Sequence, residues 1–254
     1  MKIGIPPLVI GNWKMNPQSK SLAETLAKEM KKSFAKCAGV DVVMAPPYVY
    51  LETVDRVRNG SDSFMIGAQN VHHEKLGAHT GETSLLMLQS YGVSHVILGH
   101  SERRAEGETD EAVNLKLLAV IKTGLTGVVC VGESKRDHSG HYLTHIETQI
   151  RSAFMKVSKA KLSNVVVAYE PIWAIGTGMT ATPEDVHETK LFIEKVISDL
   201  YGRNLAQKVR IIYGGSVNGK NANELYVGGL VDGFLVGGAS LHPEEFLQII
   251  KSVQ

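Results

Sequence analysis

The run Val165-Val166-Val167-Ala168-Tyr169-Glu170 joins a strand that is apolar on both faces to a carboxylate at its end. Continuous apolar runs of this kind are typical of parallel strands that other layers cover on both sides, whereas half-solvated antiparallel strands alternate apolar and polar residues. A second such run is Val128-Val129-Cys130-Val131. Together they predict a buried parallel sheet.

Short apolar or β-branched segments recur along the rest of the chain, with helical patterns between them. The predicted strands are Leu8–Ile10, Asp41–Ala45, Phe64–Ala68, His95–Leu98, Gly127–Val131, Val165–Tyr169, Val209–Tyr213 and Gly233–Val236. The apolar residues of the first predicted helix recur every four positions: Leu22, Leu26, Met30 and Phe34. Thr182-Pro183-Glu184-Asp185 and His242-Pro243-Glu244-Glu245 have the composition of helix starts, with proline and acids in the first turn.

Eight strand–helix units without a Pro/Ser-rich linker favour one α/β domain over residues 1–254. The length fits a single closed (β/α)8 TIM barrel with a parallel eight-stranded sheet, since such barrels have about 250 residues. An open doubly wound sheet uses the same unit and stays an alternative. In both folds the functional residues gather at the carboxyl ends of the strands.

The composition excludes several classes of protein. With 27 basic and 26 acidic residues the net charge is +1, so we expect no nucleic-acid or membrane-surface partner. No stretch approaches the roughly 18 apolar residues of a membrane span, and the N-terminus does not resemble a signal peptide. The only cysteines, Cys37 and Cys130, form no disulfide framework. We therefore expect a cytoplasmic protein.

Polar residues follow the first and fourth predicted strands. Asn12 and Lys14 come after the first, and Lys14 lies between Trp13 and Met15. This place suits an anion-binding lysine, although an ordinary surface charge fits equally well. His100 ends the fourth strand and precedes a predicted helix N-terminus, which disfavours the imidazolium form. A neutral ring that donates a hydrogen bond is one interpretation, and a histidine without a catalytic role is the other.

Glu170 ends the sixth strand and precedes the glycine-rich stretch Gly176-Thr177-Gly178. A carboxylate at the mouth of an apolar strand is poorly placed for a surface role, and glycines can come close to a ligand. The combination predicts a catalytic base beside a mobile loop.

Glycine pairs follow the last two strands, in Gly214-Gly215-Ser216 and Gly237-Gly238-Ala239-Ser240. Such turns expose backbone N–H groups that suit a phosphate, and barrels frequently bind phosphate after strands seven and eight. Plain turn glycines are the alternative for either pair alone.

Three other patterns do not predict a cofactor or metal site. Residues 176–181 match G-x-G-x-x-A but begin too far from the strand end for a dinucleotide motif. His141 and His145 have metal-ligand spacing, with His138 nearby, but no further ligand is evident at a strand end. Cys130, among valines, is most simply a core residue. We therefore expect no metal and no cofactor.

The strand-end blocks, taken together, resemble the triosephosphate isomerase family in order and spacing. They are Gly11-Asn12-Trp13-Lys14-Met15-Asn16, Gly99-His100-Ser101-Glu102-Arg103-Arg104, residues 169–178, Tyr213-Gly214-Gly215-Ser216-Val217 and Val236-Gly237-Gly238-Ala239-Ser240. The resemblance implies interconversion of dihydroxyacetone phosphate and glyceraldehyde 3-phosphate in glycolysis and gluconeogenesis, without a cofactor.

The resemblance also implies roles for individual residues. Glu170 would move a proton between the two carbons, His100 would polarise the carbonyl, and Lys14 would balance negative charge with Asn12 beside it. The backbone N–H groups expected to hold the phosphate of the triose phosphate substrate are those of Gly176, Ser216, Gly237 and Gly238.

A homodimer is implied as well, through the loop Gln69–Glu82. Two positions depart from the family pattern: Met179 stands where lysine is common, and His79 replaces the usual aromatic residue. We expect Met179 to have a modest effect on loop closure without loss of chemistry, and dimerisation remains the expectation despite His79.

Two other functions remain to be weighed. Another phosphate-binding barrel, such as a phosphoribosyl isomerase, would need a pocket for a larger substrate than the short turns after strands seven and eight suggest. A catalytically silent binding protein would typically have lost Lys14, His100 or Glu170, and all three are present.

Overall fold

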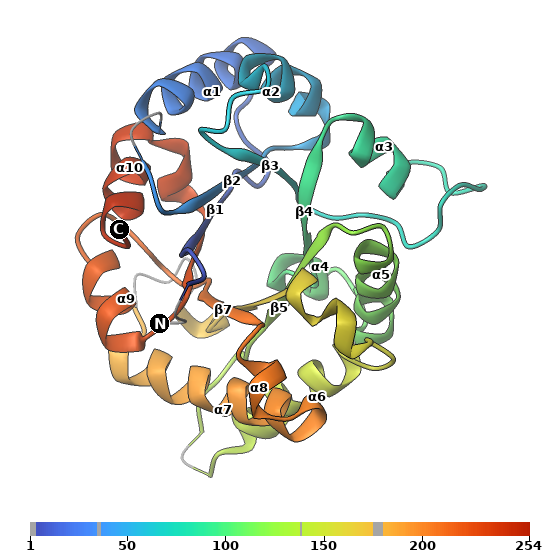
Figure 1. The fold of residues 1–254 in the computed structure, drawn as a ribbon, viewed down its shortest axis with the longest axis vertical. Helices are drawn as coiled ribbons and strands as arrows, with labels where there is room; N and C mark the ends of the chain where they lie inside the picture. The colour runs from blue at the N-terminus through green and yellow to red at the C-terminus, as the bar shows by residue number, and fades with distance from the viewer. Residues whose placement is uncertain (1–3, 35–36, 138, 175–179) are drawn as a thin grey trace.

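The centre of the molecule is a closed barrel of parallel strands, seen end-on in Figure 1. The structure, a computed structural model, describes residues 4–34, 37–137, 139–174 and 180–254. The strands follow one another around the barrel as β1 (Leu8–Asn12), β2 (Asp41–Ala45), β3 (Met65–Ala68), β4 (Val93–Leu98), β5 (Thr126–Val131), β6 (Val165–Tyr169), β7 (Arg210–Tyr213) and β8 (Gly233–Val236). Because β1 pairs with β8 in parallel, the sheet has no edge, which confirms the predicted barrel and excludes the open sheet.

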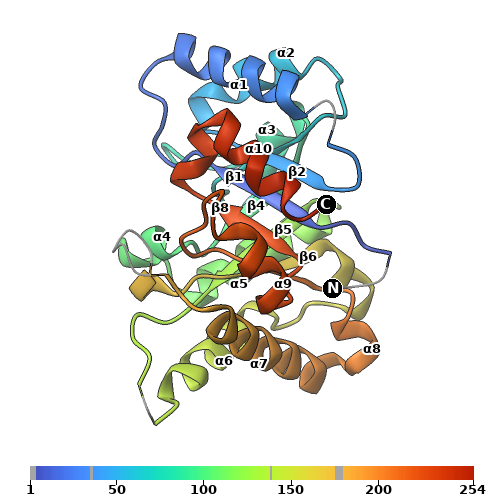
Figure 2. The same ribbon diagram turned by 90° about the vertical axis from the view of Figure 1, so that its left-hand side faces the viewer.

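Helices form a layer outside the barrel (Figures 1 and 2). They are α1 (Lys20–Phe34), α2 (Leu51–Arg58), α3 (Leu85–Ser90), α4 (Ser101–Ala105), α5 (Asp110–Lys122), α6 (His141–Ala153), α7 (Pro183–Tyr201), α8 (Arg203–Ala206), α9 (Ala222–Gly229) and α10 (Pro243–Lys251). The two helix starts predicted from sequence are confirmed at Pro183 and Pro243. No helix within the described ranges is long and apolar enough to cross a membrane.

The strands are buried on both faces, as their apolar runs predict. In β6, Val166 and Ala168 belong to the cluster that fills the barrel, whereas Val165, Val167 and Tyr169 pack under the helices. This alternation follows from the two-residue period of a strand. It places every second side chain of each strand inside the barrel.

The predicted boundaries of several strands shift by one or two residues. β1 continues to Asn12, β4 begins at Val93 and β5 begins at Thr126, whereas β3 and β7 begin one residue later than expected. The first helix differs more in detail, because Leu22 is 54% exposed while Leu26, Met30 and Phe34 are buried. A helix has 3.6 residues per turn, so a strict spacing of four drifts around the axis by about 40° a step. Ala23 therefore takes the buried place expected for Leu22.

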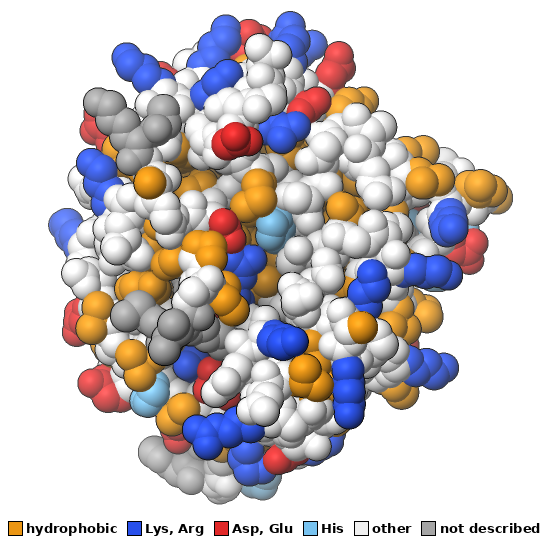
Figure 3. Space-filling view, viewed as in Figure 1, with side chains coloured by type: hydrophobic (Ala, Val, Ile, Leu, Met, Phe, Trp, Pro, Cys, Tyr) orange, Lys and Arg blue, Asp and Glu red, His pale blue; other side chains and the backbone are white. Residues whose placement is uncertain are grey.

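The two ends of the barrel differ in what they carry. Figure 2 shows both chain termini at one end and α4 at the other. The end with the termini faces the viewer in Figure 3, where histidine, basic and acidic side chains gather at the middle. There Arg210, at the start of β7, pairs with Asp41, at the start of β2, at 2.6 Å. The opposite end receives the carboxyl ends of the strands and hence the candidate site.

Candidate active site

The carboxyl ends of β1, β4, β7 and β8 surround a pocket of ≈ 440 Å³. Its lining includes, from the residues predicted to be functional, Asn12, Lys14, His100, Ser216, Gly237 and Gly238. Glu170 follows β6 and contacts His100 beside this pocket. Gly176, also predicted, lies outside the described residues, as do Met179 and the rest of the predicted loop centre.

His100 is fixed by the start of α4. It is the residue before the helix, and its Nδ1 accepts a hydrogen bond from the backbone N–H of Glu102 at 3.2 Å. A ring nitrogen that accepts carries no proton, so the proton of the neutral ring belongs on Nε2. Nε2 lies 3.3 Å from Oε1 of Glu170. The hydrogen bond at Nδ1 thus supports the neutral ring that we expected, and the Nε2 side of the ring lies close to the carboxylate.

Glu170 is almost completely buried, with 2% of its surface exposed. Its Oε2 accepts the backbone N–H of Ser101 at 2.9 Å, at the first turn of α4. Its Oε1 makes no hydrogen bond within the described part of the chain. A buried carboxylate oxygen without a donor is costly unless a ligand or a proton completes it.

Two glycines make room for Glu170. A Cβ on Gly132 would lie 1.8 Å from the Glu170 carbonyl oxygen, and a Cβ on Gly214 would lie 3.0 Å from Glu170 Cγ. Any side chain at Gly132 would therefore displace the backbone of the candidate base. The position of Glu170 therefore depends on the glycines that follow β5 and β7 as much as on β6, the strand that it follows.

Cys130 lies in the barrel interior beneath this carboxylate, as a core residue should. Burial raises the pKa of its thiol well above the ordinary value, and the charge of nearby Glu170 raises the pKa further. The thiol is therefore protonated and unreactive near neutral pH. Its contact with Glu170 was not foreseen from sequence, because β5 and β6 become neighbours only in the barrel.

Lys14 is held at its backbone and at its side chain. Its φ angle is +52°, in the left-handed region, which is uncommon for a residue other than glycine. The N–H donates to Asn12 Oδ1 at 3.0 Å, and the carbonyl accepts from Gln69 Nε2 at 2.9 Å. The ammonium group pairs with Glu102 Oε1 at 2.5 Å. These contacts hold the Lys14 cation in one place at the pocket, which favours the anion-binding interpretation.

Gln69 and Glu102 were missed as parts of the site. Glu102 belongs to a block quoted from the sequence, and Gln69 begins the loop expected at a dimer interface. Neither has a local pattern that indicates a contact with Lys14, which is 55 and 88 positions away. Only the barrel brings these three residues together.

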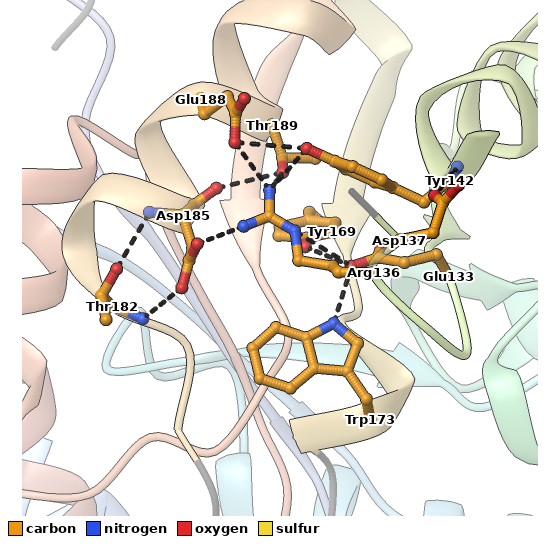
Figure 4. A network of polar contacts seen from close by, with 10 residues as sticks. All are labelled: Glu133, Arg136, Asp137, Tyr142, Tyr169, Trp173, Thr182, Asp185, Glu188 and Thr189. Atoms are coloured by element: carbon orange, nitrogen blue, oxygen red, sulfur yellow. Dashed lines mark hydrogen bonds and ion pairs between the residues drawn. The ribbon is translucent and has the colours of Figure 1, made fainter. Parts of the chain in front are cut away.

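A second polar network includes Tyr169, the residue before Glu170 (Figure 4). The buried carboxylate of Glu133 accepts from Tyr169 Oη at 2.9 Å and from Trp173 Nε1 at 2.7 Å. Burial raises the pKa of Glu133, although these hydrogen bonds act in the opposite direction. Arg136 contacts Glu133 and pairs with Asp185, which caps α7. The network thus joins the strand that carries Glu170 to the start of α7.

No metal centre emerges from the described residues. They contain no group of three or more His, Cys, Asp or Glu side chains that could hold a metal ion. His141 and His145, considered for their spacing, lie on the exposed face of α6, and His138 is outside the described residues.

Comparison with known proteins adds an independent finding. A family model described as triosephosphate isomerase matches residues 7–253. A protein of Carboxydothermus hydrogenoformans named triosephosphate isomerase is 46% identical over 247 residues, which cover 96% of this chain and 98% of that protein. Proteins with the same name from Clostridium botulinum and Lactiplantibacillus plantarum are 46% and 43% identical, again over 96% of this chain and over 98% and 97% of their own.

Proposed function

The chain belongs to the triosephosphate isomerase family, and we propose that Glu170, His100 and Lys14 carry the chemistry of that family in this protein. The protein is an isomerase that interconverts dihydroxyacetone phosphate and D-glyceraldehyde 3-phosphate through an enediolate, in glycolysis and gluconeogenesis. A phosphoribosyl isomerase and a silent barrel are thereby set aside.

Glu170 is the base in this proposal. The approach of its Oε1, which makes no hydrogen bond within the described ranges, to His100 Nε2 at 3.3 Å is the observation that supports it most. One short substrate can then present a C–H to Glu170 and the adjacent carbonyl oxygen to the His100 N–H. The base removes the proton from the carbon beside the carbonyl and returns it to the neighbouring carbon.

Lys14 and His100 stabilise the charge that grows during this step. An α-proton is weakly acidic, so the reaction needs donors directed at the developing enediolate oxygen. Lys14 supplies a fixed positive charge. Asn12 holds the backbone of Lys14 in place, because its Oδ1 accepts the Lys14 N–H. Backbone groups at Ser216, Gly237 and Gly238, together with Gly176, are the proposed phosphate ligands.

We expect the reaction to need no cofactor. Moving hydrogen between neighbouring carbons leaves the overall oxidation state of the substrate unchanged, so neither an electron acceptor nor a donor enters the balance. A proton carrier and fixed donors suffice for it.

We also propose a homodimer that forms through the segment Gln69–Glu82. Apolar side chains on and near this segment are well exposed in the single chain: Leu76 is 80%, Met15 87% and Val49 78% exposed. Contact with a second copy of the chain would remove these apolar side chains from water. We place the enzyme in the cytoplasm and treat residues 1–254 as one domain.

The role of His100 is tested by His100→Gln. The amide can donate a hydrogen bond, but it cannot exchange protons between the two enediolate oxygens, so we expect kcat to fall by about 10²-fold. A coupled assay on dihydroxyacetone phosphate measures this, with His145→Gln on the exposed face of α6 as control. A kcat of His100→Gln close to that of the control would remove His100 from the mechanism.

A further inference from the structure

Three histidines stack on one another in the segment between β3 and α3, which stands out from the barrel in Figure 1. We call residues 69–82 the projecting segment. The ring of His72 lies 4.5 Å from that of His73 at an interplanar angle of 28°, and 4.1 Å from that of His79 at 32°. The His72 ring is therefore in contact with two other imidazoles.

The backbone of the segment brings these rings together. Gly77 has φ +150°, and a Cβ at this position would lie 3.1 Å from the ring of His79. Past this glycine the chain returns, so that the His72 N–H donates to the Thr83 carbonyl at 2.9 Å. The stack closes the projecting segment on itself.

Only one ring nitrogen of His72 is free to take an additional proton. Nδ1 of His72 accepts the backbone N–H of Glu74 at 3.1 Å, so the neutral ring carries its proton on Nε2. Protonation must then occur at Nδ1, which turns an acceptor into a donor that faces another donor. Charging His72 thus breaks the hydrogen bond that anchors the ring.

The charged groups around the stack only partly offset a positive charge. Glu74 lies 3.4 Å from His79 Nε2 and 3.9 Å from His73 Nε2, and Glu82 is the other acid that acts on His72. The Glu74 carboxylate therefore lies beside both outer rings. Burial lowers the pKa of His72, and charge on His79 and His73 lowers it further, while the two acids act in the opposite direction.

We propose that the stack of His72, His73 and His79 is a pH-sensitive clasp, which holds the projecting segment closed at neutral pH and opens when His72 gains a proton. An open segment no longer presents the same surface to a second copy of the chain. Acid therefore weakens self-association, a consequence that rests on the homodimer proposed above. The clasp itself does not depend on the dimer.

His72→Asn tests the clasp directly. The side-chain oxygen of asparagine can accept the Glu74 N–H in place of Nδ1, but it cannot be protonated. We measure hydrogen exchange of the Glu74 amide by NMR between about pH 8 and about pH 5.5, corrected for the intrinsic pH dependence of exchange. In the wild-type protein we expect protection to fall by about tenfold, because the hydrogen bond is lost. In His72→Asn the protection of the Glu74 amide should change by less than about twofold. The control His145→Asn should behave like the wild type.

Sedimentation velocity over the same pH range separates the two proposals. A wild-type dimer that dissociates in acid, beside a His72→Asn dimer that does not, supports both. A wild-type protein that is monomeric at about pH 8 contradicts the homodimer, and the Glu74 amide still decides on the clasp. Unchanged Glu74 protection in the wild type, or the same loss of protection in His72→Asn, overturns the clasp.

Discussion

The catalytic proposal requires that each side chain of the site be held in one position. Oε2 of Glu170 is fixed by the Ser101 N–H, and the ring of His100 is fixed by the Glu102 N–H two residues along. Both donors belong to the first turn of α4. The base and the proposed electrophile therefore share one support, and a shift of that turn would move them together.

Lys14→Ala is the prediction for the cation. Loss of the ammonium group removes positive charge from both the bound phosphate and the enediolate, so KM should rise and kcat should fall. We expect kcat/KM to drop by at least about 10²-fold, as measured in the steady-state assay. Lys20→Ala, at the start of α1, is the control. Kinetics of Lys14→Ala equal to those of the control would reduce Lys14 to a surface charge.

Sequence position marked the residues that we propose to react, but not those that support them. Asn12, Lys14, His100 and Glu170 are recognisable because each follows a buried strand. Gln69, Glu102 and Glu133 act through contacts with residues that are distant in the chain, so they become visible only when the barrel closes. The three contacts of Lys14, likewise invisible in any local pattern, favour a positioned cation.

At the scale of elements, the start of α7, the helix that follows the glycine-rich stretch, is fixed by hydrogen bonds in its first turn. The Thr182 side chain accepts the Asp185 N–H at 3.1 Å, and the Asp185 side chain accepts the Thr182 N–H at 3.0 Å. Such reciprocal caps satisfy N–H groups that have no partner inside the helix. The sequence Thr182-Pro183-Glu184-Asp185 predicted this helix start, whereas nothing in it predicted the pairing of Asp185 with Arg136.

Thr182→Ala should lower the free energy of unfolding by about 1 kcal/mol, the usual effect of losing an N-cap side chain. Urea unfolding followed by circular dichroism measures the difference. Thr148→Ala is the matched control, because Thr148 lies inside α6 and bonds the carbonyl of Thr144 within the same helix. If Thr182→Ala were as stable as this control, the cap would contribute nothing.

The secondary structure was largely predictable because barrel strands are buried on both faces and so differ from helices over four to six residues. Strand ends were less predictable, since pairing with a neighbour decides them. β1 extends to Asn12 because Asn12 pairs with Ala45 of β2. The exposed Leu22 shows that helices have the same limit, because the elements packed against a helix determine which part of its apolar stripe is buried.

At the scale of the whole molecule, the barrel end opposite the active site contains a buried histidine. His95 is 5% exposed on β4, and its Nδ1 lies 2.8 Å from Ser94 Oγ. Burial lowers the pKa of His95 from 6.5 to about 4, and Arg210 adds to this effect. Below about pH 6.5 the unfolded chain binds a proton there that the folded barrel excludes until about pH 4.

The stability of the barrel should therefore fall as the pH drops through this window, by about 3 kcal/mol on account of His95 alone. His95→Gln cannot take up the proton and should lose correspondingly less between the two pH values. The measurement is the free energy of unfolding in urea at several pH values, with His145→Gln as control. Equal losses in the wild type and in His95→Gln would show that His95 does not couple folding to pH.

The central claim is that Glu170 carries the proton, and deuterium incorporation into dihydroxyacetone phosphate in D₂O measures that step directly. The wild-type enzyme should exchange the proton on the carbon beside the carbonyl and form glyceraldehyde 3-phosphate. Glu170→Asp withdraws the carboxylate by one methylene, so both rates should fall by about 10²-fold or more while the fold is retained. Near wild-type exchange in Glu170→Asp, or no exchange in the wild type, would contradict the account.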